Sequence, residues 1–314
     1  MQLIHESLHT RREPQPQLEN MSDSTLDKIA AIKKALATPA PRRPNFFKIY
    51  GERNTGTNFL SELIRSNINL EEITQHAGSA ETKKNLESLL TITPTAPLHS
   101  RKLIKNIYTQ RAIDADRDLN MSKELGWKHG CIDYQFLSQY SRFHETVFIL
   151  LTRNPWSFLL SLFRKPYNII PAPRQSHSFS DFLRSPILCN ARDRVGGKAI
   201  LDTPARLWPL KVESYHKFAK ESPIQNSILF NYESVVSNPG SALNKVAGLA
   251  KRKRRKEILI PQSSSKNDDR TFADFQKAVF TFDPMLNMSR EDALFIQEIA
   301  TIELLEKTGY QSLT

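Results

Sequence analysis

Apolar and polar residues follow one another along this chain of 314 residues in blocks that predict strands followed by helices. The short apolar run at 46–50 (FFKIY) predicts a strand, and residues 58–68 carry apolar side chains at helical spacing. A second apolar run at 147–152 (VFILLT) is typical of a strand that is buried in a parallel sheet. A helix should follow it, because Asn154 can cap a helix and Pro155 suits the first helical position.

The pattern continues in the second half of the chain. It predicts helices at 204–220, 240–250 and 292–307, and a strand at 227–232. Strands that alternate with helices indicate an α/β fold, with a central, mostly parallel sheet flanked by helices in a single domain.

The beginning of the chain has a different character. Residues 1–43 are mostly polar and rich in proline towards their end, and they offer one short amphipathic helix at 24–37. We therefore expect an N-terminal tail over 1–43 and a folded domain over 44–314.

Charge and cysteine content narrow the class of protein. Lys and Arg number 44 against 33 Asp and Glu, and the net charge of +11 favours an anionic partner such as a nucleotide, a nucleic acid or an acidic membrane. The two cysteines, Cys131 and Cys189, exclude a disulfide framework, and no Cys/His spacing indicates a metal site. No apolar run approaches the roughly 20 residues of a membrane span, and the N-terminus lacks a secretory signal. A cytoplasmic location is therefore expected.

The first motif with chemical meaning is the turn between the first strand and the first helix. Residues 51–57 (GERNTGT) have the two-glycine spacing of a phosphate-binding loop, in which backbone N–H groups and the helix dipole face an anion. A nucleoside-triphosphate loop continues with Lys and Ser/Thr, whereas Thr57 and Asn58 stand here. The loop therefore suits a nucleotide held without metal and without a β/γ-phosphate. The alternative is an ordinary tight turn, capped by Thr55 or Thr57.

The second motif begins at the end of the second strand. Arg153 stands at the expected carboxyl end of that strand, where open α/β sheets bind ligands, and its guanidinium can grip a phosphate with two hydrogen bonds. Ser161 follows eight residues later on an otherwise apolar helix and should have a polar partner. The alternative partner is the backbone of its own helix.

Together, GERNTGTNFL and TRNPWSFLLSLFRKPY resemble the two nucleotide motifs of the sulfotransferases that use 3′-phosphoadenosine 5′-phosphosulfate, over roughly residues 45–240. The resemblance implies a P-loop NTPase-like fold and an enzyme that transfers a sulfuryl group from this donor to an acceptor hydroxyl without a metal ion. It leaves open whether the acceptor is a glycan, a lipid-linked sugar or a small alcohol. The residues it implies for the two phosphates are Thr55, Gly56, Thr57 and Asn58 for the 5′-phosphate, and Arg153 and Ser161 for the 3′-phosphate.

One position departs from the family pattern. The family often has a basic residue where Asn54 stands, and here the basic residue is Arg53, one place earlier. Arg53 is long enough to reach the phosphosulfate, so both residues are kept as candidates for donor binding.

The transfer needs a base near the acceptor hydroxyl. His129 is the best candidate, because imidazole titrates near neutral pH and Lys128–His129 resembles the Lys-x-His of cytosolic members. The two residues are adjacent, so on a regular strand only one of them would face the site. The rival bases are three carboxylates: Glu52, Glu81 and Asp133.

Two later segments complete the candidate site. Tyr232 and Glu233 resemble a Tyr-Glu that follows a later strand in the family. We expect Tyr232 to line the adenine side; a core tyrosine is the alternative. Residues 251–256 (KRKRRK) are either a solvated, mobile segment or a contact for an anionic acceptor or the 3′-phosphate.

Two other functions compete with sulfuryl transfer. A nucleotide kinase would need the missing P-loop lysine. A non-catalytic protein that binds nucleic acid would use the basic run, but no nucleic-acid-binding signature is present, so no nucleic-acid partner is expected.

Overall fold

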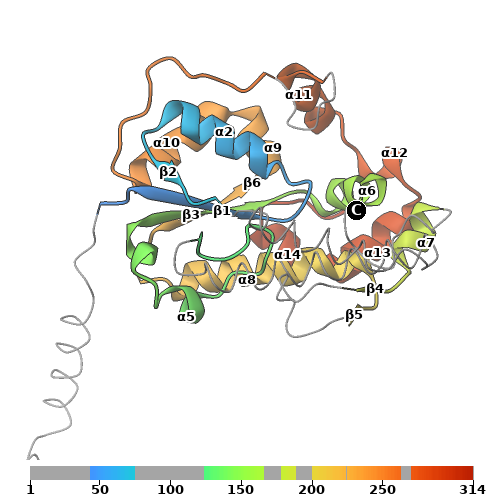
Figure 1. Cartoon of the computed structure of the whole chain (residues 1–314). Coiled ribbons are helices and arrows are strands. Elements are labelled where there is room, and N and C mark those ends of the chain that lie inside the picture. Colours follow the sequence, from blue (N-terminus) through green and yellow to red (C-terminus); the bar gives the residue numbers. More distant parts are fainter. Residues whose placement is uncertain are drawn as a thin grey trace, which may run out of the picture. The chain divides into compact units, whose positions relative to one another are not determined.

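A four-stranded parallel sheet forms the centre of the computed structural model, which describes residues 43–74, 124–165, 178–188, 200–223, 225–262 and 270–313. The strand order is β2-β1-β3-β6, and every neighbouring pair is parallel (Figure 1). The strands are β1 (Phe46–Gly51), β2 (Glu71–Glu72), β3 (Thr146–Thr152) and β6 (Ser227–Asn231). The prediction of an α/β fold with a parallel sheet flanked by helices is confirmed.

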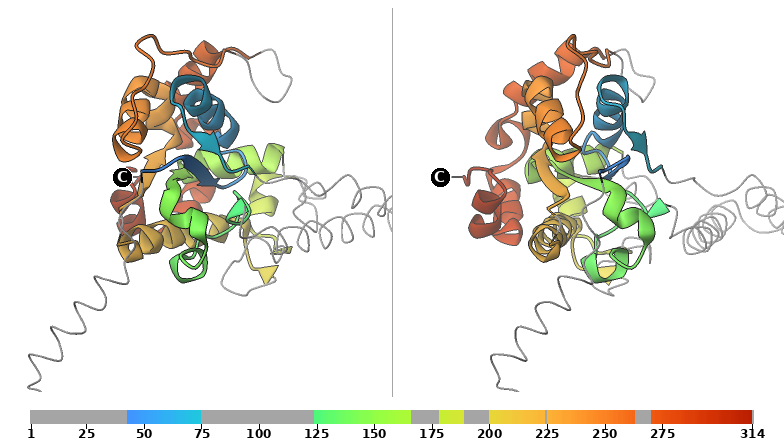
Figure 2. Two further views of the ribbon diagram at one scale, coloured as in Figure 1. Left: turned by 60° about the vertical axis from the view of Figure 1, so that its left-hand side comes forward. Right: turned by 90° about the vertical axis from the view of Figure 1, so that its left-hand side faces the viewer.

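Helices cover both faces of this sheet (Figures 1 and 2). One face carries α2 (Thr57–Asn67), α9 (Tyr232–Ser237), α10 (Pro239–Leu249) and α11 (Phe272–Phe280). The other face carries α5 (Tyr134–Leu137), the 3-10 helix η1 (Ser141–Glu145) and α8 (Leu207–Glu221).

The remaining elements belong mostly to a third apolar cluster, which is built around the helix that follows β3. They are α6 (Pro155–Arg164), α7 (Phe179–Leu183), the 3-10 helix η4 (Pro204–Arg206), α12 (Pro284–Asn287), α13 (Arg290–Ala300), α14 (Ile302–Lys307) and the antiparallel pair of β4 (Ile187–Leu188) with β5 (Ile200–Leu201).

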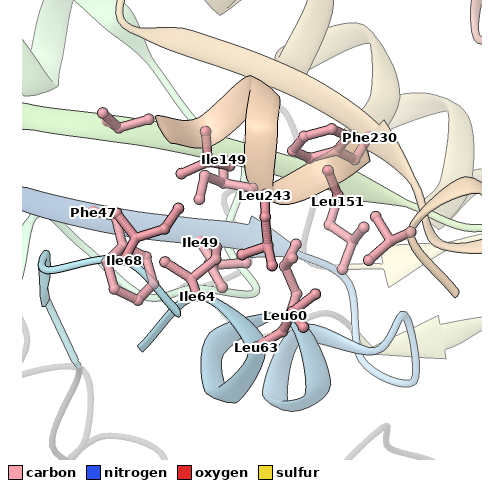
Figure 3. Packing of buried hydrophobic residues seen from close by; sticks show 14 of the residues in the cluster. Phe47, Ile49, Leu60, Leu63, Ile64, Ile68, Ile149, Leu151, Phe230 and Leu243 are labelled. Carbon is pink, nitrogen blue, oxygen red and sulfur yellow. The ribbon is translucent and has the colours of Figure 1, made fainter. Parts of the chain in front are cut away.

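The largest share of the sheet's own core lies between β1, β3 and the helices α2 and α10 (Figure 3). Alternate strand residues point into it, because successive side chains of a strand face opposite ways. Phe47 and Ile49 of β1 and Ile149 and Leu151 of β3 pack there against Leu60, Leu63, Ile64 and Leu243. This packing fixes α2 directly behind the loop that precedes it.

The predicted elements agree with the structure closely in its described parts, with one correction near the C-terminus. The single helix predicted over 292–307 is wrong, because the chain breaks at Thr301, whose φ of 59° ends α13 before α14 begins. The helices α9 and α11 were not predicted. The tail over 1–43 lies, except for Arg43, outside the described residues.

The basic run 251–256 is held against the domain by specific contacts. Arg252 donates to the backbone oxygen of Pro44 and to Asn45 Oδ1, and Arg254 donates to Asn244 Oδ1. Because Pro44 and Asn45 directly precede β1, the run lies at the edge of the sheet where β1 begins, opposite the carboxyl ends (Figure 1). The run is solvated, as one interpretation expected, with four of its six residues exposed. Its position argues against contact with a phosphate at the loop.

None of the helices in the described parts of the chain is long and apolar enough to cross a membrane.

Lys48 is a charged side chain inside the sheet. It lies on β1 and is 1% exposed, and its Nζ donates to the backbone oxygen of Glu124 at 2.6 Å. Burial lowers the pKa of Lys48 to about 7, although the charges of Glu124 and Glu72 act in the opposite direction. The folded protein therefore holds this proton less tightly than the unfolded chain does.

A Lys48→Met variant tests this cost. Below about pH 7 both states bind the proton and the folded protein bears the full cost, whereas between pH 7 and 10.5 the unfolded chain binds more protons, so stability rises with pH. The wild type should therefore gain up to about 1.4 kcal/mol of unfolding free energy per pH unit relative to the variant. Urea unfolding at pH 7, 8 and 9 measures this difference.

The exposed Lys220 of α8 supplies the matched control, since Lys220→Met should follow the wild-type pH dependence. Equal pH slopes for wild type and Lys48→Met would show that the buried ammonium carries no such cost.

Candidate functional site

The carboxyl ends of the three long strands bring the predicted nucleotide residues to one edge of the sheet. The loop from Glu52 to Gly56 follows β1, Arg153 follows β3, and Tyr232 follows β6. Open parallel sheets bind ligands at this edge. The two sequence motifs, about a hundred residues apart in the chain, therefore meet in space.

The loop closes on itself before α2 begins. The carbonyl of Glu52 accepts hydrogen bonds from the backbone N–H of Thr55 at 3.2 Å and from its hydroxyl at 2.5 Å. Gly56 then takes a left-handed φ of 83° and precedes the first helical residue, Thr57, and no side chain caps this helix end. The expected tight turn is present, but neither Thr55 nor Thr57 caps the helix. A helix N-terminus of this kind presents backbone N–H groups to an anion.

Gly56 is also required by what packs against it. A Cβ at this position would lie 2.5 Å from two carbon atoms of the Tyr232 ring. The Arg153 guanidinium lies over the same ring, 5.1 Å from its centroid. Loop, tyrosine and arginine thus form one contact, which places Tyr232 beside the loop.

Arg153 is fixed in place by three neighbours. Its Nε donates to Ser157 Oγ at 2.9 Å, a guanidinium nitrogen donates to the carbonyl of Asn54 at 2.8 Å, and its own carbonyl accepts from Trp208 Nε1. Burial lowers the pKa of Arg153. The serine that bonds to Arg153 is Ser157, whereas Ser161 lies one helical turn further along the same face of α6.

Asn54 explains the departure from the family pattern at its position. Its φ is 65°, a left-handed conformation that Asn tolerates better than most residues. Its Nδ2 lies 3.4 Å from the carbonyl oxygens of Ser161 and Lys165, so the side chain fastens the loop to α6. Asn54 is a structural contact between loop and helix in this chain.

His129 is bonded directly to the residue that begins the loop. Its Nδ1 lies 2.6 Å from the carbonyl oxygen of Gly51, and the N–H of Gly51 donates to the carbonyl of Lys128 at 2.8 Å. Because a carbonyl only accepts, Nδ1 carries the hydrogen, and the lone pair of the neutral ring is on Nε2. The segment that holds the predicted base therefore runs alongside the end of β1.

The environment of His129 keeps its imidazole neutral. Burial is the main cause that lowers its pKa well below 6.5, and the charges of Arg53, Lys128 and Lys211 act in the same direction. Trp127 packs edge-on against the ring, with centroids 4.9 Å apart. At neutral pH the group is an unprotonated base that needs no prior loss of a proton.

Lys128 and His129 do not lie on a regular strand. Residues 127–130 form a turn, in which the N–H of Gly130 donates to the carbonyl of Trp127. Strict alternation of faces therefore does not apply, and both side chains reach the loop region: Lys128 Nζ donates to Asn58 Oδ1 at 2.8 Å. Burial lowers the pKa of Lys128.

The Arg53 side chain is buried next to Trp127 and Glu52. Its guanidinium lies over the ring of Trp127 at 4.7 Å, and one nitrogen lies 3.4 Å from Glu52 Oε1. The second oxygen of Glu52 lies 3.5 Å from Nζ of Lys211 on α8. Glu52, Arg53 and Lys211 thus form a buried charged group next to His129.

The structure separates the rival carboxylates. Glu52 is engaged by two cations, and Asp133 caps α5 by accepting the N–H of Phe136 at 3.1 Å. Glu81 lies outside the described residues. Among the described candidates, His129 lies directly against the end of β1, and its Nε2 lone pair can accept a proton because Nδ1 carries the hydrogen.

Glu233, next to Tyr232, ties two strand ends together. One of its oxygens accepts from the N–H of Asn154 at 3.0 Å and the other from the hydroxyl of Tyr310 at 3.0 Å. Burial raises the pKa of Glu233. Its contacts hold the Arg-Asn-Pro segment in place and are structural.

Sequence reasoning missed three residues at this site: Ser157, Lys211 and Arg270. Arg270 acts through its charge on Arg153 and Tyr232, and it precedes the unpredicted helix α11. The sequence does contain a signal for Lys211. It lies on the apolar face of α8, between Trp208 and Tyr215, where a charged residue is unexpected.

Within the described segments, no group of three or more His, Cys, Asp or Glu side chains could hold a metal ion.

Comparison with known proteins finds similarity to solved structures alone. No family model and no curated protein matches the chain. Three solved structures similar to it are the sulfotransferase domain of the curacin biosynthetic pathway, the sulfotransferase domain of the Synechococcus PCC 7002 olefin synthase and a sulfotransferase from Alicyclobacillus acidocaldarius. In that order, their TM-scores are 0.36, 0.43 and 0.37 and their sequence identities are 11%, 12% and 14%. The matches cover 87%, 88% and 86% of this chain. They cover 100%, 98% and 97% of the three matched chains. Because these values are low, we base the function proposed below on the site's own contacts.

Gly56→Ala should disrupt the contact between the loop and Tyr232. The variant adds a methyl group where a Cβ meets the ring at 2.5 Å, and it adds strain at a positive φ. We expect the unfolding free energy to fall by about 1–3 kcal/mol. Thermal and urea denaturation measure the loss.

Gly248→Ala is the matched control. Gly248 lies in α10 with nothing within 4 Å of its added Cβ, so the substitution should raise stability by about 0.5–1 kcal/mol. A Gly56→Ala variant as stable as Gly248→Ala would contradict the packing described for Tyr232.

Proposed function

We propose that this chain is a sulfotransferase that moves a sulfuryl group from 3′-phosphoadenosine 5′-phosphosulfate to an acceptor hydroxyl. The observation that carries the proposal is the bond between His129 Nδ1 and the carbonyl of Gly51. It puts a neutral base, with its lone pair on Nε2, beside a loop suited to a phosphate.

The residues of the site fit the two phosphates of this donor. The N-terminus of α2, from Thr55 to Asn58, would hold the 5′-phosphate through backbone N–H groups, with Lys128 and Arg53 close by. Arg153 and the face of α6 that carries Ser157 and Ser161 would hold the 3′-phosphate.

The reaction requires one proton to be accepted and one leaving group to be stabilised. As the acceptor oxygen forms its bond to sulfur, His129 Nε2 takes the hydroxyl proton. The bond between sulfur and the 5′-phosphate oxygen breaks, and the cations and N–H groups at the loop stabilise the charge on the leaving adenosine 3′,5′-bisphosphate. The loop lacks the lysine and the hydroxyl of a nucleoside-triphosphate site, which supports transfer without metal. The proposed acceptor is a hydroxyl compound, and a carbohydrate is one option. The proposed location of the protein is the cytoplasm.

Binding of adenosine 3′,5′-bisphosphate tests the donor site. Calorimetry in excess chelator should show binding, and Arg153→Ala should weaken it at least about tenfold, because charge-assisted bonds worth about 1.5–3 kcal/mol each are lost. The effect should be much smaller for adenosine 5′-phosphate, which lacks the 3′-phosphate.

Arg206→Ala is the matched control, since Arg206 pairs with Asp202 on an exposed part of the domain. It should leave the affinity unchanged. Binding that requires magnesium, or that is equal in wild type and Arg153→Ala, would favour a kinase or a non-catalytic protein.

His129→Ala tests the base. With an acceptor found by screening hydroxyl compounds against radiolabelled donor, turnover should fall roughly 10²–10⁴-fold while bisphosphate affinity barely changes. Since the pKa of His129 lies well below 6.5, wild-type turnover should stay constant through neutral pH and fall only in clearly acidic solution.

Two further variants complete this test. His216→Ala, at a half-buried histidine whose ring faces Thr308, should keep wild-type turnover. Lys128→Ala should reduce turnover by lessening the positive charge near the sulfuryl group. Near-normal turnover in both His129→Ala and Lys128→Ala would move the base to another residue.

A further inference from the structure

A pair of opposite charges, Glu52 and Lys211, is buried behind the phosphate loop. Glu52 is 5% exposed and Lys211 1%, and Nζ lies 3.5 Å from Oε2. Taking two charges out of water is expensive, and apolar side chains of similar volume often fill such a space at lower cost. The pair therefore points to a role beyond packing.

The carboxylate end of the pair organises the loop. Glu52 Oε1 accepts the backbone N–H of Arg53 at 2.7 Å and faces its guanidinium at 3.4 Å. The backbone carbonyl of Glu52 accepts hydrogen bonds from the N–H and the hydroxyl of Thr55. Glu52 thus sets both the path of the backbone and the direction of the Arg53 side chain.

The ammonium end of the pair holds the segment of the proposed base. Lys211 Nζ donates to the carbonyl of His129 at 2.5 Å, and the His129 ring in turn bonds to Gly51. Lys211 comes from α8, on the face of the sheet opposite α2, so it joins that helix to the loop and to the His129 turn at once.

We propose that Glu52 and Lys211 are positioning residues that hold Arg53 and His129 in a fixed arrangement across the loop. The inference rests on the proposed function only for the roles of Arg53 and His129. The coupling itself is a property of the folded protein and can be measured without donor or acceptor.

The charge of Lys211 reaches the imidazole, which gives the coupling a spectroscopic readout. Three cations face His129 and lower its pKa: Arg53 from the loop, Lys128 from the same turn and Lys211 from α8. On α8, Tyr215 lies one turn beyond Lys211, and burial and the charge of Glu52 raise the pKa of its hydroxyl. Removing Lys211 alone therefore removes one of the three positive charges near the ring.

The decisive variant is Lys211→Met in the full chain, with the His129 resonance assigned by comparison with His129→Ala. An NMR titration should show the imidazole pKa shifted upward from its wild-type value, because a positive charge that opposes protonation is lost. Lys217→Met is the control: Lys217 lies on the exposed side of α8, 3.8 Å from Glu221, and its loss should leave the titration unchanged.

A second variant guards against a failure of Lys211→Met to fold, since Lys211→Met leaves the buried Glu52 without one of its two cationic partners. Glu52→Gln combined with Lys211→Met removes both charges. The imidazole pKa should still move upward, but by less than in Lys211→Met, because the lost carboxylate favoured protonation. The loss of stability in the double variant should be smaller than the sum of the two single losses, because the pair acts as a unit.

The possible results separate this inference from the proposed function. If the imidazole pKa is unshifted in Lys211→Met and in the double variant and only stability falls, the pair has a purely structural role. That result would overturn the inference. An upward shift together with no binding of adenosine 3′,5′-bisphosphate by the wild type would support the coupling and contradict the sulfotransferase.

Discussion

The site depends on the absence of a side chain at residue 51. A Cβ on Gly51 would lie 2.7 Å from Thr57 Cγ2, 2.9 Å from Thr55 Oγ1 and 3.0 Å from the carbonyl oxygen of Leu151. The missing Cβ leaves room for Thr55 and Thr57 to pack over the end of β1. The backbone of Gly51 also accepts from the His129 ring and donates to the carbonyl of Lys128. One residue therefore joins the sheet, the loop and the segment of the proposed base.

Around this joint, among the described residues, the cations outnumber the carboxylates Glu52, Glu72 and Glu233 that act on them. Arg53, Lys128, Lys211 and Arg153 lie near the loop, whereas Glu52 is the carboxylate that pairs with two of them. Like charges at such positions disfavour one another, and burial lowers the pKa of Lys128 and of Arg153. An arrangement of this kind is costly for folding and favourable for a polyanionic ligand, which supplies the missing negative charge when it binds.

The sequence predicted the parts of the site whose identity depends on short stretches of chain. The loop is such a part, because glycines between a strand and a helix have a strong local meaning, and Arg153 follows from the end of a buried strand. The contacts of these residues could not be predicted, because they join distant segments: Arg153 to the carbonyl of Asn54, and Lys211 to that of His129. The turn at 127–130 was missed for a related reason. The alternation of side-chain directions applies to strands only, and it does not indicate where a strand is absent. The break at Thr301 depends on a single backbone angle that no periodicity encodes.

The order of the strands also has a consequence for how the chain folds. β1 pairs with β3 in a register that sets Phe46 opposite Thr146, about a hundred residues later, and β3 pairs in turn with β6. No two adjacent long strands of this sheet can form as a hairpin, so each pairing must close a long loop before it gains any contact. Proteins dominated by such distant pairings fold slowly. The site is therefore assembled only after synthesis has passed β6, because Tyr232 and Glu233 follow that strand. A nascent chain that carries the complete loop still lacks these two residues.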